Sequence, residues 1–297
     1  MIDGVLLLDK PAGLSSNAAL QRARRAVRAE HAGHTGTLDP LASGLLPLVL
    51  GDAAKFGQVM LDADKEYLAQ VHLGARTSTG DAEGEIVETA PLPPDDRIAF
   101  ERVLAGFRGP IRQVPPMHSA LKQGGVPLYK MAREGVEVER AAREVQILAL
   151  DLVSVDLPVL ELRVRCSKGT YIRTLAEDIG RAMGTQAHLQ GLRRTAVGAF
   201  RIEDAVGLED FEAMQAAERV ARLLPLDAPL GALPRVDLDG VCAQRLRHGQ
   251  SARLASAALL QGRVRAYTPA GAFLGVVDCA AGELRVVRLV RETRESA

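Results

Sequence analysis

Leu160-Glu-Leu-Arg-Val-Arg-Cys166 alternates apolar with charged side chains, and the segment after it, Ser167-Lys-Gly-Thr-Tyr-Ile-Arg-Thr-Leu-Ala-Glu-Asp-Ile-Gly180, turns through a glycine. Alternation with a period of two predicts a half-buried antiparallel strand. Thr174 and Glu177 have the spacing of a capping box, so we expect a helix to begin there. Arg173 would then lie just before the helix, held on rigid elements. Strands of this kind favour an antiparallel or mixed sheet over a doubly wound parallel sheet.

A second informative segment, His31-Ala-Gly-His-Thr-Gly-Thr-Leu-Asp-Pro-Leu-Ala-Ser-Gly-Leu-Leu-Pro47, contains the candidate Asp39. Its glycines, its threonines and the Asp39–Pro40 bond predict an irregular loop, because a residue before proline is disfavoured in a helix. Leucines on both sides suggest that the Asp39 carboxylate lies at the rim of an apolar pocket. A buried arginine needs an anion, and Asp39 would suit Arg173. We expect this pairing to keep Asp39 ionised, although burial alone raises the pKa of a carboxyl group.

Two other interpretations of this loop stay open. Asp39 could simply form the turn that an Asp-Pro dipeptide favours. Alternatively, His31, His34 and Asp39 could bind a metal ion, as in a metallohydrolase. The metal site is the weaker interpretation, because a His-x-x-His spacing on a glycine-rich loop fixes no common face and no further His or Cys follows nearby.

Length and charge divide the chain into two parts. At roughly 150 residues per domain, 297 residues predict two domains, or one large and one small. The stretch 235–297 has ten Arg, no Lys and six acidic residues, a surplus of +4 that the preceding residues balance. Leu224 to Pro234 contains three prolines and no helical or strand period, which predicts a linker. Three short β-like runs beyond it predict a small β-barrel: Arg263 to Tyr267, Phe273 to Val277 and Leu284 to Val290.

The composition argues against several classes of protein. A net charge of zero argues against general coating of polyanions, and 3% aromatic residues without Trp argue against gripping single strands by serial base stacking. Ser15-Ser16 before Asn17 to Arg28 predicts the capped start of a basic helix. This helix and the basic tail nevertheless leave room for an RNA groove. No apolar run approaches the ~20 residues of a membrane helix. Three widely spaced cysteines imply neither a disulfide framework nor a paired-cysteine zinc site, so a reducing cytoplasm is the expected setting.

The two segments closely resemble the signature motifs of the TruB family of tRNA pseudouridine synthases, over Gly33 to Pro47 and over Ser167 to Gly180. The resemblance runs in the same order from Gly4 to about Val290, and one departure from it is His118, where tyrosine is expected. Further matching motifs are Leu8-Asp-Lys-Pro-Ala-Gly-Leu-Ser-Ser16, Asp64-Lys-Glu-Tyr67, Thr79-Gly-Asp81, Gln113-Val-Pro-Pro-Met117, Ser119-Ala-Leu-Lys122, Leu128-Tyr-Lys-Met-Ala-Arg-Glu-Gly135 and His188-Leu-Gln-Gly-Leu-Arg-Arg194.

This resemblance implies an α+β fold. The expected catalytic domain, residues 1–223, is a pseudouridine-synthase domain built on a mixed, mainly antiparallel sheet flanked by helices. Residues 122–145 would form the mobile insertion with which the family clamps RNA, although an ordinary surface hairpin is the alternative. A linker over 224–234 would join this domain to a small C-terminal β-barrel over 235–292 that is similar to an RNA-binding PUA domain.

The implied activity is the isomerisation of uridine 55 in the T-arm of tRNA to pseudouridine, with base flipping and with no cofactor or metal. Asp39 matches the family's catalytic aspartate, and Arg173 matches the residue that forms an ion pair with it. Tyr67 matches the aromatic residue that stacks on the flipped uracil and moves a proton. Further residues match the substrate-binding set: His34, Tyr171, Leu192 and Lys10, the last within a motif that supports the Asp39 loop. The resemblance leaves open whether Asp39 attacks C1′ or C6 or acts as a base.

The expected partner is tRNA, bound at its T-arm by the catalytic domain and at its acceptor-arm side by the C-terminal domain. We expect a cytoplasmic monomer that requires no membrane and no protein partner. Other functions stay open beside the metallohydrolase: a non-catalytic RNA-binding or RNA-folding protein on the same scaffold, and a subunit that depends on a guide RNA. Asp39, Tyr67 and Arg173 together count against the non-catalytic protein.

Overall fold

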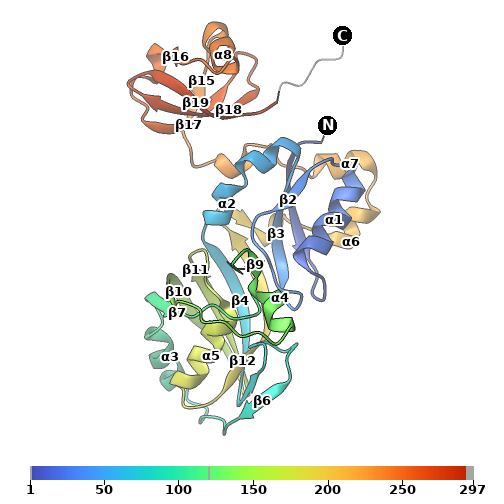
Figure 1. The fold of residues 1–297 in the computed structure, drawn as a ribbon, viewed down its shortest axis with the longest axis vertical. Helices are drawn as coiled ribbons and strands as arrows, with labels where there is room; N and C mark the ends of the chain where they lie inside the picture. Colours follow the sequence, from blue (N-terminus) through green and yellow to red (C-terminus); the bar gives the residue numbers. More distant parts are fainter. Residues whose placement is uncertain (1, 120, 292–297) are drawn as a thin grey trace.

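The computed structural model describes residues 2–119 and 121–291. The predicted domain end at residue 292, and Ala120 within one of the matching motifs, lie outside the described residues. Figure 1 shows an elongated molecule in which a small β domain caps a larger α+β body. Among the residues described, no helix is both long enough and apolar enough to cross a membrane.

A ten-stranded mixed sheet runs the length of the larger body in the order β14-β1-β3-β12-β4-β11-β10-β7, with β13 beside β12 and β2 beside β3. Its strand pairs are antiparallel except for β1 with β14 and β12 with β3. The mixed, mainly antiparallel sheet expected from the sequence is therefore confirmed. The strands are β1 (Gly4–Lys10), β2 (Ala32–His34), β3 (Ser43–Leu50), β4 (Lys65–Leu73), β7 (Gly109–Gln113), β10 (Arg143–Asp156), β11 (Val159–Cys166), β12 (Ala187–Val197), β13 (Phe200–Arg201) and β14 (Val206–Gly207).

Strand β11 behaves as its alternating pattern predicts. Leu160, Leu162 and Val164 point into the core and are almost completely buried, while the charged residues between them face outward. This strand lies between β4 and β10 in the sheet, so its buried face contributes to the main hydrophobic core. Because one face of the strand is apolar and the other charged, its register against both neighbours is strongly specified.

Helices cover the sheet at both ends of the body. In Figure 1, α1, α6 and α7 gather beside the N-terminal strands, and α3 and α5 lie against the other half of the sheet. The helix α1 begins as predicted, because Ser15 caps it by accepting a hydrogen bond from the Ala18 amide at 3.2 Å. The α-helices of the body are α1 (Ser16–Val27), α2 (Gln58–Asp62), α3 (Arg97–Ala105), α4 (Leu128–Arg133), α5 (Ile172–Ala182), α6 (Leu208–Ala213) and α7 (Ala216–Ala221).

The predicted start of α5 is wrong. The helix begins at Ile172 with Tyr171 as its N-cap residue, so Thr174 and Glu177 do not form a capping box. Ile172 is buried with the rest of the apolar face, and burial of this side chain extends the helix by most of a turn toward its N-terminus. Arg173 consequently lies in the first turn of the helix rather than before it.

The segment from His31 to Pro47 is also more regular than predicted. Only its middle is a loop, because its ends form β2 and the first half of β3. Leu45, Leu46 and Leu48 are completely buried, and β3 pairs with β1 from Gly44 to Leu50. Burial of these leucines outweighs the local preference of glycine and proline for loops.

The C-terminal residues form a second, five-stranded sheet in the order β15-β17-β18-β19-β16, and it curls as a half-barrel. The three β-like runs expected from the sequence correspond to β17, β18 and β19, which confirms a PUA-like fold. Its apolar core includes Val264, Val277 and Leu284, covered by α8. The elements are β15 (Arg235–Asp237), α8 (Gly240–Arg247), β16 (Ala252–Arg253), β17 (Gly262–Tyr267), β18 (Phe273–Ala280) and β19 (Glu283–Leu289).

The segment 224–234, predicted as a linker, packs against both bodies. Leu224 exchanges two backbone hydrogen bonds with Val5 of β1, at 2.8 and 3.0 Å. Leu230 is buried in a small cluster with Phe56 and Val276. The C-terminal sheet therefore contacts the larger body through an apolar cluster, and the domain boundaries themselves stay a prediction.

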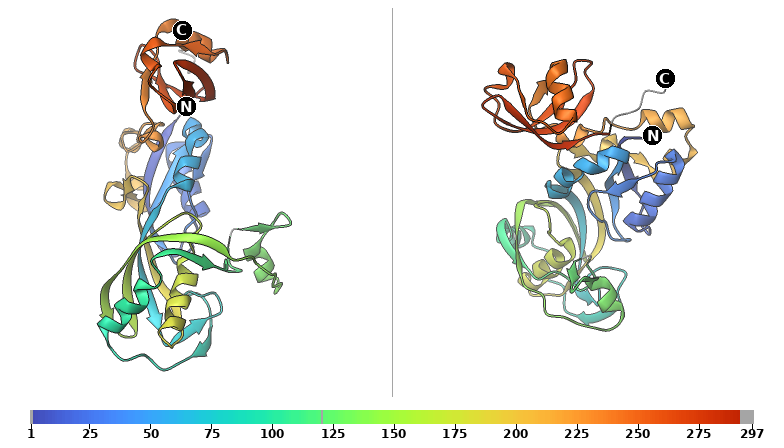
Figure 2. Two further views of the ribbon diagram at one scale, coloured as in Figure 1. Left: turned by 90° about the vertical axis from the view of Figure 1, so that its left-hand side faces the viewer. Right: turned by 45° about the horizontal axis from the view of Figure 1, so that its top comes forward.

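Residues 122–145 include a short hairpin, β8 (Lys122–Gln123) with β9 (Val126–Pro127), followed by α4. This arm projects sideways from the body in Figure 2. It joins the sheet through β10 at its C-terminal side. A clamp for RNA therefore stays a prediction for this segment. A second hairpin, β5 (Ala75–Thr77) with β6 (Ile86–Thr89), lies at the far end of the body.

Gly44, the second residue of β3, tests how closely the strands beneath the Asp39 loop are packed. Its φ is +102°, and an added Cβ would lie 2.3 Å from the backbone oxygen of Arg194 in β12. We expect Gly44→Ala to lower the free energy of unfolding by about 3–5 kcal/mol, since backbone strain and a clash add together. Gly13→Ala is the matched control, because its φ is +78° with open space around it, and about 1–2 kcal/mol is expected. Urea denaturation would measure both, and equal losses would contradict the argument.

Candidate active site

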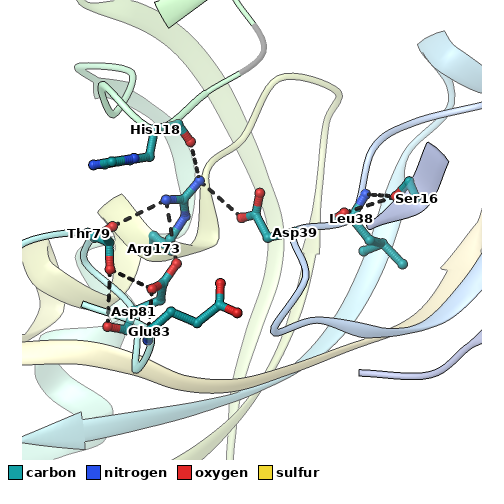
Figure 3. A network of polar contacts seen from close by, with 8 residues as sticks. All are labelled: Ser16, Leu38, Asp39, Thr79, Asp81, Glu83, His118 and Arg173. Carbon is teal, nitrogen blue, oxygen red and sulfur yellow. Dashed lines mark hydrogen bonds and ion pairs between the residues drawn. The ribbon is translucent and has the colours of Figure 1, made fainter. Parts of the chain in front are cut away.

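Asp39 lies in the loop between β2 and β3, and its neighbours fix that loop to the protein (Figure 3). The Ser16 hydroxyl accepts a hydrogen bond from the Leu38 amide at 2.8 Å and donates one to the Leu38 carbonyl at 2.9 Å. Leu38 itself is buried, and the Pro40 carbonyl accepts a hydrogen bond from the Gly13 amide at 2.7 Å. The residues on either side of Asp39 are therefore immobilised, which leaves its carboxylate in a defined position.

Arg173 connects the Asp39 loop with two other segments. Its Nη2 lies 3.0 Å from Asp39 Oδ2 and donates to the His118 carbonyl at 2.6 Å. Its Nη1 donates to the Thr79 carbonyl at 3.2 Å and lies 3.5 Å from Asp81 Oδ2. The side chain is 7% exposed. The Asp39–Arg173 pairing expected from the sequence is therefore present, and Figure 3 shows the guanidinium at the centre of the network.

Asp81 is the second carboxylate beside Arg173, and it is almost completely buried. Its Oδ1 accepts hydrogen bonds from the Thr79 hydroxyl at 2.6 Å and from the Glu83 amide at 3.1 Å. The turn that carries it is bonded to β12, because the Ala82 amide donates to the Leu189 carbonyl at 3.0 Å. Asp81 thus holds Arg173 from the side opposite to Asp39.

The protonation of Asp39 reflects a competition between burial and charge. Burial in the pocket raises the pKa of Asp39, and the charge of Asp81 raises it further, while Arg173 and Lys10 lower it. The net direction is upward, although 40% of the side chain remains exposed. Burial and Asp81 therefore outweigh Arg173 and Lys10 in setting the pKa of Asp39. That the ion pair with Arg173 keeps Asp39 ionised stays a prediction.

A cavity of about 260 Å³ opens beside Asp39 and Arg173. Ligand pockets commonly occupy roughly 300–1,000 Å³, so this one suits a single flat ring rather than a large ligand. The predicted residues Tyr67, Tyr171 and Leu192 all line it, from β4, from the start of α5 and from β12. The structure therefore brings together five of the seven residues that the sequence singled out.

Tyr171 is held in this cavity by Gln113 at the end of β7. The Gln113 side chain accepts a hydrogen bond from the Tyr171 amide at 3.0 Å and donates one to the Tyr171 carbonyl at 3.2 Å. Burial raises the pKa of both Tyr67 and Tyr171, so both phenols are neutral near neutral pH. A neutral phenol can still donate and accept a hydrogen bond.

His34 lies elsewhere, on a second cavity of about 540 Å³ that adjoins Asp39 and Arg173. Burial lowers the pKa of His34 and Arg194 lowers it further, which favours the neutral imidazole. Over residues 2–119 and 121–291, no three His, Cys, Asp or Glu side chains gather closely enough to hold a metal ion. The metal site of His31, His34 and Asp39 is therefore not formed.

Lys10, predicted among the substrate-binding residues within a motif that supports the Asp39 loop, lines neither of the two cavities, and a role in substrate binding stays a prediction. Lys10 is 0% exposed, and its ammonium group donates to the carbonyls of Pro11 at 2.8 Å and Leu14 at 2.6 Å. Burial lowers its pKa to about 8. Lys10 supports the segment that underlies the Asp39 loop instead of facing the cavity.

Sequence reasoning missed Asp81, Gln113, Lys65 and Arg194 as site residues. Asp81 and Gln113 stand in matching motifs, but nothing in the pattern shows that their side chains point toward Arg173 and Tyr171. Lys65 and Arg194 line the cavity beside Tyr67, from β4 and β12. Lys65 lies two residues before Tyr67, and Arg194 lies two residues after Leu192, so each pair shares one face of its strand. This spacing was the signal by which the sequence could have identified both residues.

Comparison with known families agrees with this arrangement. Residues 24–172 match the family model described as "TruB family pseudouridylate synthase (N terminal domain)". Residues 173–231 match "tRNA pseudouridylate synthase B C-terminal domain", and residues 234–290 match "Pseudouridine synthase II TruB, C-terminal".

Similar proteins and structures extend over nearly the whole chain. A protein named tRNA pseudouridine synthase B from Burkholderia mallei is 54% identical over 97% of this chain and 97% of its own. One of the same name from Aromatoleum aromaticum is 54% identical over 98% of this chain and 93% of its own. A solved Cbf5–Nop10–Gar1 complex contains a chain with a TM-score of 0.71 and 26% identity, over 97% of this chain and 84% of that one.

Titration of Asp39 tests the balance of charges around it. By ¹³C NMR we expect a carboxyl pKa above the ordinary value of 3.8. Arg173→Met removes the stabilising cation and should raise this pKa further, whereas Asp81→Asn removes a like charge and should lower it. Because the folded protein binds this proton more tightly than the unfolded chain, the contribution of Asp39 to stability falls as pH rises from about 4 through the folded pKa. Shifts in the opposite directions would contradict the assignment.

Proposed function

Because the chain belongs to the TruB family and is a pseudouridine synthase, an isomerase, we propose that it converts uridine 55 in the T-arm of tRNA to pseudouridine. The observation that carries this proposal is the Asp39–Arg173 ion pair at the wall of a cavity suited to one flat ring. The relatives named tRNA pseudouridine synthase B support tRNA as the substrate.

The reaction rearranges bonds without changing the composition of the nucleotide. The N1–C1′ bond breaks, a C5–C1′ bond forms, and the balance is completed when C5 loses a proton and N1 gains one. Asp39 is the catalytic carboxylate, and its exposed surface faces the site where the sugar would lie. As nucleophile or as base, Asp39 must be ionised to act. The target base must first leave its stack, at a cost of a few kcal/mol.

The residues around Asp39 divide the remaining tasks. Arg173 orients the carboxylate through their ion pair, and Asp81 and the His118 carbonyl hold Arg173 in turn. Tyr67 stacks on the flipped uracil and passes a proton, and Tyr171 and Leu192 complete the walls of the cavity. His34 binds substrate from the adjoining cavity.

Each step of this assignment uses protein side chains, so the reaction needs no cofactor and no metal. The projecting arm within residues 122–145 clamps the RNA, and the C-terminal domain contacts the acceptor-arm side of tRNA. The domains comprise residues 1–223 and 235–292, joined by 224–234. The protein works as a cytoplasmic monomer.

Asp39→Asn is the direct test of the catalytic assignment. The amide keeps the shape of the side chain but cannot act as nucleophile or base, so we expect pseudouridine formation on a T-arm stem-loop to fall by at least about 10⁴-fold, near the uncatalysed level. Binding of the stem-loop should survive within a few-fold. Asp151→Asn, an exposed change on β10, is the matched control and should retain full activity. Because the isomer has unchanged mass, the product is detected after chemical derivatisation. Near-normal turnover of Asp39→Asn would contradict the assignment of Asp39 as the catalytic carboxylate.

A second experiment separates the remaining alternatives. Purified chain alone, given unmodified tRNA transcript without any guide RNA or protein, should form pseudouridine at position 55 only. A short T-arm stem-loop should react at the same rate with and without excess chelator. A requirement for guide RNA would favour the guide-dependent subunit, loss of activity with chelator would favour metal catalysis, and binding without product would favour the non-catalytic protein.

A further inference from the structure

Two buried cations border the small cavity and take no part in the assignment so far. Arg194 is 1% exposed and Lys65 is 7% exposed, and both line the cavity together with Tyr67. Lys65 precedes Tyr67 by two residues on β4, so both side chains lie on the same face of the strand. Arg194 is the direct cross-strand partner of Tyr67 on β12. Both cations are therefore immediate neighbours of Tyr67 in the sheet.

Both cations have only neutral hydrogen-bond acceptors. Lys65 donates to the carbonyls of Leu61 at 2.7 Å and Ala63 at 2.6 Å. Arg194 donates to the carbonyls of Leu45 at 2.7 Å and Gly36 at 3.1 Å. Among the described residues, no carboxylate forms an ion pair with either of them. They also lie close together, because a Cβ on Gly36 would be 3.5 Å from Arg194 Nη1 and 4.0 Å from Lys65 Cε.

Structural needs alone do not explain two full charges here. A neutral amide could donate to the same carbonyls, and burying an unpaired cation costs free energy that a neutral side chain avoids. The cost is visible at Lys65, where burial and the nearby Arg194 lower the pKa to about 8. Positive potential built into a cavity wall is compensated when negative charge enters the cavity.

The proposed reaction generates negative charge in this cavity. When the N1–C1′ bond breaks, its electron pair stays on the uracil ring, which delocalises it over the ring and its two carbonyl oxygens. Asp39 acts on the sugar that the ring has left, either by forming a bond to it or by removing a proton from it. The detached ring must then turn so that C5 bonds to C1′, after which C5 loses its proton and N1 takes one. Throughout the turn the ring carries the charge.

From this juxtaposition we infer that Lys65 and Arg194 form a cationic wall that stabilises the negative charge on the uracil ring while it is detached from the sugar. The inference rests on the proposed function and adds two residues to it. Backbone carbonyls fix both side chains, so the two charges need not reorient during the reaction. Charge preorganised in this way stabilises developing negative charge without a reorganisation cost. Tyr67, which lines the same cavity, keeps the ring over the wall.

A comparison of two substrates tests this inference. T-arm stem-loops carrying uridine or 5-fluorouridine at the target position are reacted under single-turnover conditions, and loss of the target nucleoside is followed by chromatography of nuclease digests. Fluorine withdraws electrons and lets the ring carry negative charge more easily, so the enzyme's cations matter less. Lys65→Met and Arg194→Met should each slow the uridine reaction on the order of 100-fold. The same variants should slow the 5-fluorouridine reaction at most about tenfold.

Lys10→Met is the matched control, since it removes another buried ammonium group that donates only to carbonyls but does not line the cavity. It should slow both substrates by the same factor. Lys65→Arg, which keeps the charge, should be faster than Lys65→Met on uridine. Because the ratio of two rates is taken within one preparation, partial loss of folded protein cancels.

Equal slowing of both substrates by Lys65→Met and Arg194→Met would overturn the inference, as would a loss below about threefold on uridine. The proposed function fails differently, because the unaltered protein would then form no pseudouridine or Asp39→Asn would remain active. The two failures are therefore distinguishable within one set of measurements.

Discussion

The arrangement of the site depends on one buried guanidinium. Arg173 contacts Asp39, Asp81, and the carbonyls of Thr79 and His118, which come from three segments far apart in the sequence. A buried cation must have its donors satisfied, so each of these segments is held where Arg173 requires it. The helix α5 supplies the rigid base, because its apolar face is packed into the main core.

Negative and positive side chains lie on different sides of the site. On one side, two carboxylates share Arg173, and burial with the second carboxylate raises the pKa of Asp39. On the other side, Lys65 and Arg194 have no anionic partner among the described residues. A neutral chain thus contains a locally polarised cavity, since net charge sums over the surface and says little about a pocket. A reaction in which negative charge moves from enzyme to base and back suits such a cavity.

The regular elements with a strong period were predictable from the sequence. The alternation in Leu160 to Cys166 identified a half-buried strand, and the Ser15 cap identified the start of α1, because both depend on residues close together in the chain. The start of α5 and the strand β3 were not predicted correctly. In both, tertiary burial of Ile172 or of Leu45 to Leu50 overrode the local preference of Thr174, or of Gly44 and Pro47.

By itself the sequence determined the catalytic candidates, because family motifs preserve residue identity: Asp39, Arg173, Tyr67, Tyr171 and Leu192 lie together as the resemblance implied. Only the tertiary structure decided which way each side chain points. It buried Lys10 completely, set His34 on an adjoining cavity and placed Asp81 against Arg173. Within the described part of the chain it also left Lys65 and Arg194, which line the cavity with Tyr67, without a carboxylate partner. Distances, burial and the sum of nearby charges arise from segments that meet only in the folded chain, and these quantities set the protonation and potential on which the chemistry depends.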